Sequence, residues 1–142
     1  MTTAIVNATA EPIPVASPSR ARAWTGRVIT ALIVLLLVVD AGAKLLEATP
    51  SVKGSIQLGF DPSVTFGLGA LLMLCTLIYV VPRTAGLGAV LLTGYLGGAV
   101  AIHLRAGNGA FPIVFSLAVG ALAWLGLVLR EPGVLQAFWR RA

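Results

Sequence analysis

The sequence predicts an all-α membrane protein in which four transmembrane helices form a bundle. Two observations carry this prediction. Of the 142 residues, 58% are hydrophobic and 11% are charged, whereas a soluble domain carries about 25% charged residues. The apolar residues also gather into four runs, each close to the ~20 residues that a helix needs to cross a bilayer. These runs span residues 28–48, 64–81, 86–104 and 111–129.

Proline residues mark the ends of the apolar runs. A proline has no backbone N–H and is tolerated best near a helix end, and the prolines concerned are Pro50, Pro62, Pro82, Pro112 and Pro132. Residues 1–23 are rich in Ala, Pro, Thr and Ser without an apolar period, which predicts a disordered N-terminal tail. A transmembrane domain over residues 24–132 then follows, with a short basic amphipathic tail over residues 133–142.

The distribution of Lys and Arg predicts the orientation of the helices, because cytoplasmic flanks carry an excess of these residues. Seven arginines flank one side of the predicted bundle: Arg20, Arg22, Arg27, Arg83, Arg130, Arg140 and Arg141. The other side has only Lys53 and Arg105. Both termini are therefore expected in the cytoplasm, and the lipid bilayer is the first partner that the sequence implies.

The first apolar run also resembles a secretory signal peptide. Basic residues precede the stretch 28–39, and the triplet Ala41-Gly42-Ala43 has the small residues of a cleavage site. Cleavage would leave three helices. We favour an uncleaved helix because the region before the run is long and Asp40 interrupts it just before the triplet.

Several kinds of site are disfavoured by composition. The net charge is +5, but the basic residues stand at the ends of apolar runs and form no continuous patch, so nucleic-acid binding is not expected. With one cysteine, Cys75, the chain can form neither an internal disulfide nor a CxxC redox pair. One histidine and one cysteine also argue against a metal site.

Small residues follow one face of the run 86–104. In lipid, such residues let helix backbones approach closely, and the ones concerned are Ala89, Thr93, Gly94, Gly97, Gly98 and Ala101. The sequence therefore predicts that this helix is the buried packing element of the bundle. The same face would equally serve a homo-oligomer.

Three charges extend the first apolar run. The stretch 28–39 has only 12 residues, or about 18 Å of helix, too short to span a bilayer. The helix must therefore continue through Asp40, Lys44 and Glu47, which share one face at 3.6 residues per turn. Asp40 stands four residues before Lys44, the favoured order for an ion pair. Because each charge near the bilayer centre costs about 2.5–3.5 kcal/mol, the charges should face the bundle interior.

The position of each residue along its helix predicts which side chains lie at the same depth as these charges. Lys44 lies about 24 Å beyond Val28, and His103 lies about 26 Å beyond Gly86 on a helix that runs the same way. We expect a polar pocket that opens toward the outer leaflet, with Arg105 beside it and Tyr95 as its floor. The structural alternative is that Lys44 and Arg105 extend to the outer headgroups while Asp40 only joins helices.

Three segments give the chain a resemblance to a known family. They are VPRTAGLGAVLLTGYLGGAVAIHLR (residues 81–105), DAGAKLLEA around Lys44, and WLGLVLREP (residues 124–132). These stretches resemble the DoxX-like family of small four-helix membrane proteins over roughly residues 28–132. The resemblance implies a multi-pass protein of the bacterial plasma membrane. Lys44, Gly97, Gly98, Ala99, His103 and Arg105 fall on positions that recur in the family.

The resemblance also implies a link to redox chemistry. The family takes its name from a subunit of an archaeal thiosulfate:quinone oxidoreductase, and some bacterial relatives are linked to membrane oxidoreductase complexes. Our first hypothesis is a subunit that binds a quinone-like amphiphile and supports such a complex. The absence of a cysteine pair argues against direct sulfur chemistry by this chain.

Two other hypotheses remain open. One is a scaffold without a ligand site, in which the charges and small residues only assemble helices or subunits. The other is a small proton-coupled transporter of the small multidrug resistance type, with Asp40 as the proton carrier. Lys44 one turn away disfavours it, because an ion-paired carboxylate exchanges protons poorly near neutrality.

Overall fold

The computed structural model describes residues 20–131 and residue 133. Most of the predicted N-terminal tail and nearly all of the predicted C-terminal tail, residues 134–142, lie outside the described residues. The described part is helical, with no strand. Its helices are α1 (Arg20–Leu45), α2 (Thr49–Gln57), α3 (Val64–Val80), α4 (Ala85–Ala106) and α5 (Ala110–Arg130). The first helix thus reaches back into the stretch 20–23 that the sequence placed in the tail.

Within the described residues the structure has five helices, beside the four transmembrane helices that the sequence predicted. The four predicted runs correspond to α1, α3, α4 and α5, whereas α2 is a short additional helix. By length and composition, α1, α4 and α5 are each long and apolar enough to cross a membrane. With 17 residues, α3 is shorter, at about 26 Å against a hydrocarbon core of about 30 Å.

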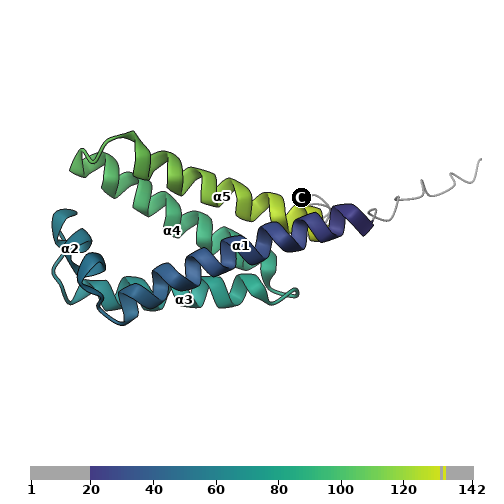
Figure 1. The fold of residues 1–142 in the computed structure, drawn as a ribbon, viewed down its shortest axis with the longest axis horizontal. Helices are drawn as coiled ribbons and strands as arrows, with labels where there is room; N and C mark the ends of the chain where they lie inside the picture. The colour runs from purple at the N-terminus through teal and green to yellow at the C-terminus, as the bar shows by residue number, and fades with distance from the viewer. Residues whose placement is uncertain (1–19, 132, 134–142) are drawn as a thin grey trace, which may run out of the picture.

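The four longer helices lie lengthwise beside one another, and each runs opposite to the next in sequence (Figure 1). Both α1 and α4 pack against α3 and against α5, so α1 and α4 lie on opposite sides of the molecule. The start of α1 and the end of α5 lie at the same end. At the other end, α2 lies on the same side as the turn between α4 and α5 (Figure 1) and contacts α1 and α3.

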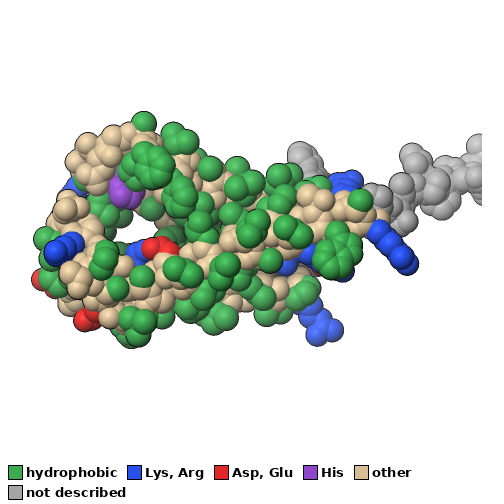
Figure 2. Space-filling model, in the orientation of Figure 1, with side chains coloured by type: hydrophobic (Ala, Val, Ile, Leu, Met, Phe, Trp, Pro, Cys, Tyr) green, Lys and Arg blue, Asp and Glu red, His purple; other side chains and the backbone are tan. Residues whose placement is uncertain are grey.

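Large apolar side chains cover the outer surfaces of all four longer helices. Leu35 of α1, Leu74 of α3 and Leu87 of α4 are each more than half exposed, and Leu125 of α5 is nearly half exposed. Green side chains dominate this surface in Figure 2. Apolar patches of this extent mark contact with a partner or with lipid, and the length of the helices fits lipid.

Close helix contacts at glycines pack the end where α1 begins. A Cβ added at Gly88 of α4 would lie 2.3 Å from the backbone of Tyr79 in α3. At Gly26 of α1 it would lie 2.7 Å from the backbone nitrogen of Arg130 in α5. Only glycine allows the backbones to come this near, so these two positions hold α1, α3, α4 and α5 together.

Tyr79 reinforces the same end. Its side chain is fully buried, and its hydroxyl donates a 2.7 Å hydrogen bond to the carbonyl oxygen of Ala123 in α5. Arg130 of α5 donates a 2.9 Å hydrogen bond to the Tyr79 carbonyl oxygen, and its guanidinium carbon lies 5.1 Å from the centre of the Tyr79 ring. These contacts join α3 to α5.

The prediction that α4 is buried along its length is wrong. Its buried residues all lie in its first half: Ala85, Gly88, Ala89 and Leu92. Of the predicted packing residues, Ala89 is buried, whereas Thr93, Gly94, Gly97, Gly98 and Ala101 are exposed. The physical reason is the position of α1 on the far side of the molecule, which leaves the second half of α4 without a helix across from it.

Thr93 nevertheless takes part in helix packing. Its hydroxyl accepts a 2.9 Å hydrogen bond from the indole nitrogen of Trp124 in α5 and donates one of 2.8 Å to the carbonyl oxygen of Ala89. By contrast, no atom lies within 4 Å of a Cβ added at Gly94, Gly97 or Gly98. These three glycines allow a close approach that none of the described helices makes.

Candidate functional site

A cavity of about 1090 Å³ occupies the end of the molecule where α2 lies, and all five helices contribute to its wall. Pockets that bind small molecules typically have volumes of about 300–1,000 Å³, so this one is large enough for a lipid-like ligand. Figure 2 shows the hollow, with the histidine side chain in purple on one rim and acidic and basic side chains on the facing rim. The second half of α4, which has no described helix across from it, forms one wall of the cavity.

Four of the six predicted site residues line this cavity. Asp40 and Lys44 come from α1, and Tyr95 and His103 come from α4. Lys44 and His103 thus line the same cavity from different helices. Glu47 and Arg105 are absent from the lining.

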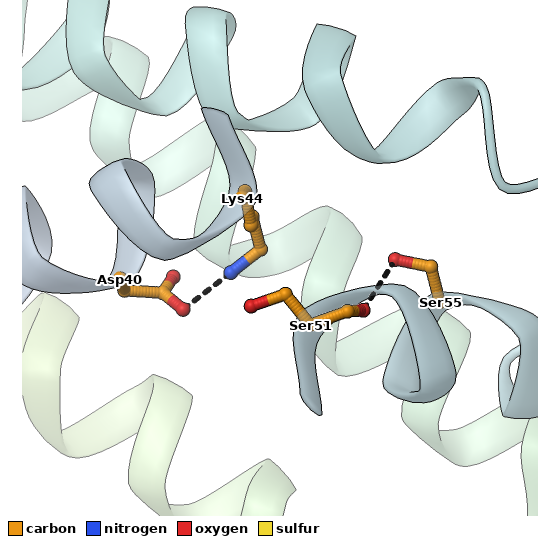
Figure 3. A network of polar contacts seen from close by, with 4 residues as sticks. All are labelled: Asp40, Lys44, Ser51 and Ser55. Atoms are coloured by element: carbon orange, nitrogen blue, oxygen red, sulfur yellow. Dashed lines mark hydrogen bonds and ion pairs between the residues drawn. The ribbon is translucent and has the colours of Figure 1, made fainter. Parts of the chain in front are cut away.

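Asp40 and Lys44 form an ion pair through Oδ1 and Nζ, as their spacing of four residues predicts. The Lys44 side chain is 19% exposed and that of Asp40 is 47% exposed. In Figure 3 the ammonium group lies between the Asp40 carboxylate and the hydroxyl of Ser51, which points toward it from α2. The pair lies within one helix, so it orients Lys44 and does not join helices.

Glu47 departs from the predicted stripe because α1 ends at Leu45. Glu47 lies in the turn before α2, with a φ of 48°. The turn brings Pro50 into the first turn of α2, where its missing N–H costs little. Pro50 has no N–H to bond the carbonyl oxygen of Leu46, so it would break α1 if that helix continued through residue 50. The prediction of three charges on one helix face is wrong for Glu47.

Arg105 lies at the end of the cavity without lining it. A Cβ added at Gly59, in the turn between α2 and α3, would meet the Arg105 guanidinium at 3.3 Å. The side chain therefore reaches from the end of α4 to that turn. His103, two residues earlier, is half-buried, and its Nδ1 lies 3.3 Å from the side-chain nitrogen of Asn108.

The sequence reasoning missed the part of the cavity wall that α2 supplies. Ser51 and Ser55 line the cavity, and the Ser55 hydroxyl donates a 3.1 Å hydrogen bond to the Ser51 carbonyl oxygen. The signal for α2 was weak, since Thr49–Gln57 contains Pro50 and Gly54 and no apolar run.

Two aromatic side chains of α5 also line the cavity. They are Phe111 and Phe115, with ring centres 6.1 Å apart.

The chemistry available in the cavity is hydrogen bonding and charge stabilisation. Lys44 donates through its ammonium group, Tyr95, Ser51 and Ser55 offer hydroxyls, and His103 donates or accepts. Among the described residues, no group of three His, Cys, Asp or Glu side chains could hold a metal ion. The lining therefore suits a ligand with a small oxygen-bearing head group and an apolar body.

Comparison with known proteins places the chain in a family. No match was found among curated proteins or among solved structures. The family model described as the DoxX-like family matches residues 28–126, a range that contains α2, α3, α4 and the larger part of α1 and α5. Because this match covers well over half of the chain, the protein belongs to the DoxX-like family.

Proposed function

We propose that this multi-pass membrane protein binds a quinone-like amphiphile in the cavity and serves as a subunit associated with a membrane redox complex. The observation that supports the proposal is the cavity itself. It combines an apolar wall with an ion pair and a histidine at one end, a pattern typical of small-molecule sites.

The ion pair supplies the head-group chemistry. A lysine ammonium group has three N–H donors, and the Asp40 carboxylate holds Lys44 in place. A further N–H of Lys44 would donate to a ligand carbonyl oxygen and stabilise the negative charge that develops when the carbonyl is reduced. His103 would hydrogen-bond the same head group or exchange a proton with it.

In our proposal α1, α3, α4 and α5 all cross the membrane, with both termini in the cytoplasm. Two features support this arrangement. The start of α1 and the end of α5 lie at one end of the molecule (Figure 1). Among the described residues, five arginines flank the helix ends at that side: Arg20, Arg22, Arg27, Arg83 and Arg130. The cavity then lies in the outer half of the bilayer of a bacterial plasma membrane.

The redox association rests on what the family resemblance implies, and quinones are membrane-soluble electron carriers with the polarity that this cavity suits. The scaffold alternative is weakened because the ion pair lies within α1 and joins no helices. The transporter alternative is weakened because Asp40 is paired. A homo-oligomer remains compatible with the proposal, since Gly97 and Ala101 are exposed and outside the cavity lining.

Identification of copurifying small molecules tests the proposed function. Wild type, Lys44→Met, His103→Phe and a control, Lys53→Met, would be purified, and their bound organic molecules extracted and identified by mass spectrometry. Lys53 is exposed on α2 and does not line the cavity. We expect a quinone or related amphiphile with wild type and the control, and its loss from the two cavity variants at unchanged thermal stability. Equal recovery from all four proteins, or from none, would contradict the proposal.

A further inference from the structure

The cavity is polarised along the length of the helices. At the end near α2 its lining includes Lys44, Ser51 and His103. Farther from α2 the lining includes the apolar side chains of Leu37 on α1, Cys75 on α3 and Val90 on α4, with Tyr95 between them and the polar end. Because α1 and α4 run toward α2 and α3 runs away from it, the three apolar residues lie at the deep end, near the middle of the molecule.

Two glycines of α4 form the part of the cavity wall that lies between its polar end and its apolar end. Gly94 and Gly98 stand one turn apart on α4 and both line the cavity. No atom of another described segment lies within 4 Å of a Cβ added at either position, so neither glycine is required by a contact between the described helices. What their missing side chains provide is open space inside the cavity, over about 6 Å of helix length.

We propose, on the basis of the function proposed above, that the ligand carries an apolar chain and that Gly94 and Gly98 determine which chains fit. The head group lies among Lys44, Ser51 and His103. The chain lies against the bare backbone at the two glycines and ends among Leu37, Cys75 and Val90. Burial of each CH₂ group in such a wall favours binding, so affinity increases with chain length until the deep end is filled.

This arrangement assigns separate roles to the two ends of the cavity. The polar end recognises the head group and binds a quinone with or without a chain. The glycine wall acts only on ligands with a chain, because a head group at the level of Lys44 and His103 does not reach Gly94. A bulky side chain at residue 94 should therefore block the chain and spare the head group.

The test compares two probes, a benzoquinone without a side chain and the same benzoquinone with a short isoprenoid chain. Their affinities would be measured by titration of purified wild type, Gly94→Leu and Gly94→Ala in one detergent. The matched controls are Gly97→Leu on the same helix and Gly67→Leu on α3. Both control glycines are exposed, have no atom within 4 Å of an added Cβ and do not line the cavity. The affinity of each variant is divided by that of wild type for the same probe. Partitioning of the probe into detergent affects both affinities equally and cancels in this ratio.

We expect Gly94→Leu to weaken binding of the chain-bearing quinone about tenfold or more and to change binding of the chainless quinone by less than about twofold. Gly94→Ala should have a smaller effect, and both controls should match wild type. Equal weakening of both probes by Gly94→Leu, or no weakening of either, would overturn the inference while leaving quinone binding intact. Failure of wild type to bind either probe would instead overturn the proposed function, and this inference with it.

Discussion

Gly88 and Tyr79 mark the closest approach between α3 and α4, since a Cβ at residue 88 would lie 2.3 Å from the Tyr79 backbone nitrogen and Cα. Gly88→Ala should therefore force the two backbones apart and destabilise the protein by about 1–3 kcal/mol, the usual cost of overpacking. The measurement is the thermal unfolding midpoint in detergent. Gly97→Ala is the matched control on the same helix, because its Cβ would meet no atom within 4 Å. A Gly88→Ala protein as stable as the control would show that this contact is wrong.

The Tyr79 hydroxyl provides a second test of the packed end. Tyr79→Phe removes the 2.7 Å hydrogen bond to the Ala123 carbonyl oxygen, and we expect a loss of about 0.5–1.5 kcal/mol in the free energy of unfolding. Tyr95→Phe serves as the control, because no hydrogen bond of its hydroxyl is seen within the described residues. Chemical denaturation of both variants measures the difference. Equal effects would contradict a special role for Tyr79.

The Asp40–Lys44 pair predicts a specific order of stabilities. Asp40→Asn leaves the Lys44 charge in the cavity without its carboxylate, whereas Asp40→Asn combined with Lys44→Met removes both charges. Removal of one partner of a sheltered pair costs more than removal of both, so the double variant should be the more stable of the two. The coupling from a double-mutant cycle should be about 0.3–1 kcal/mol. A coupling of zero would show that water screens the pair fully.

Asp61, in the turn before α3, predicts a pH dependence outside the membrane-spanning segments. Its Oδ1 accepts hydrogen bonds from the Ser63 hydroxyl at 2.6 Å and from the Ser63 backbone N–H at 2.9 Å. These bonds hold the pKa of Asp61 below its ordinary value. A lowered pKa in the folded state means that the carboxylate stabilises the fold above its unfolded pKa of about 4 and ceases to do so as pH falls through the folded pKa.

The expected result is a difference in unfolding midpoint between wild type and Asp61→Asn that is largest at neutral pH. The difference should narrow as the pH is lowered below about 4. Ser63→Ala, which removes the hydroxyl donor, should show a smaller difference with the same dependence. A difference that stays constant or widens on acidification would contradict this role of Asp61.

Most of the helical layout was predictable from the sequence because apolar run length is a direct signal. The limits of α3, Val64–Val80, and of α5, Ala110–Arg130, lie within a residue of the predicted runs. The short helix α2 was not predictable by that signal, since it has no apolar run. Hydropathy therefore predicts only those helices that must cross lipid.

The candidate site was predictable where it depended on spacing within one helix and not where it depended on packing. The Asp40–Lys44 pair follows from the spacing of four residues, and helix rise predicts that Lys44 and His103 lie at one level. Small residues, however, show only that close approach is allowed. Gly88 makes such a contact and Gly94 does not, although the two look alike in the sequence.

The central claim is that the cavity holds an amphiphile through Lys44, and native mass spectrometry of the intact protein tests it most directly. Wild type, Lys44→Met and the control Lys53→Met would be released from detergent and the fraction carrying a bound small molecule compared. Our account predicts one ligand mass per chain on wild type and on Lys53→Met, and its absence from a folded Lys44→Met protein. The same ligand fraction on all three proteins, or no ligand on wild type after incubation with the chain-bearing quinone, would contradict it.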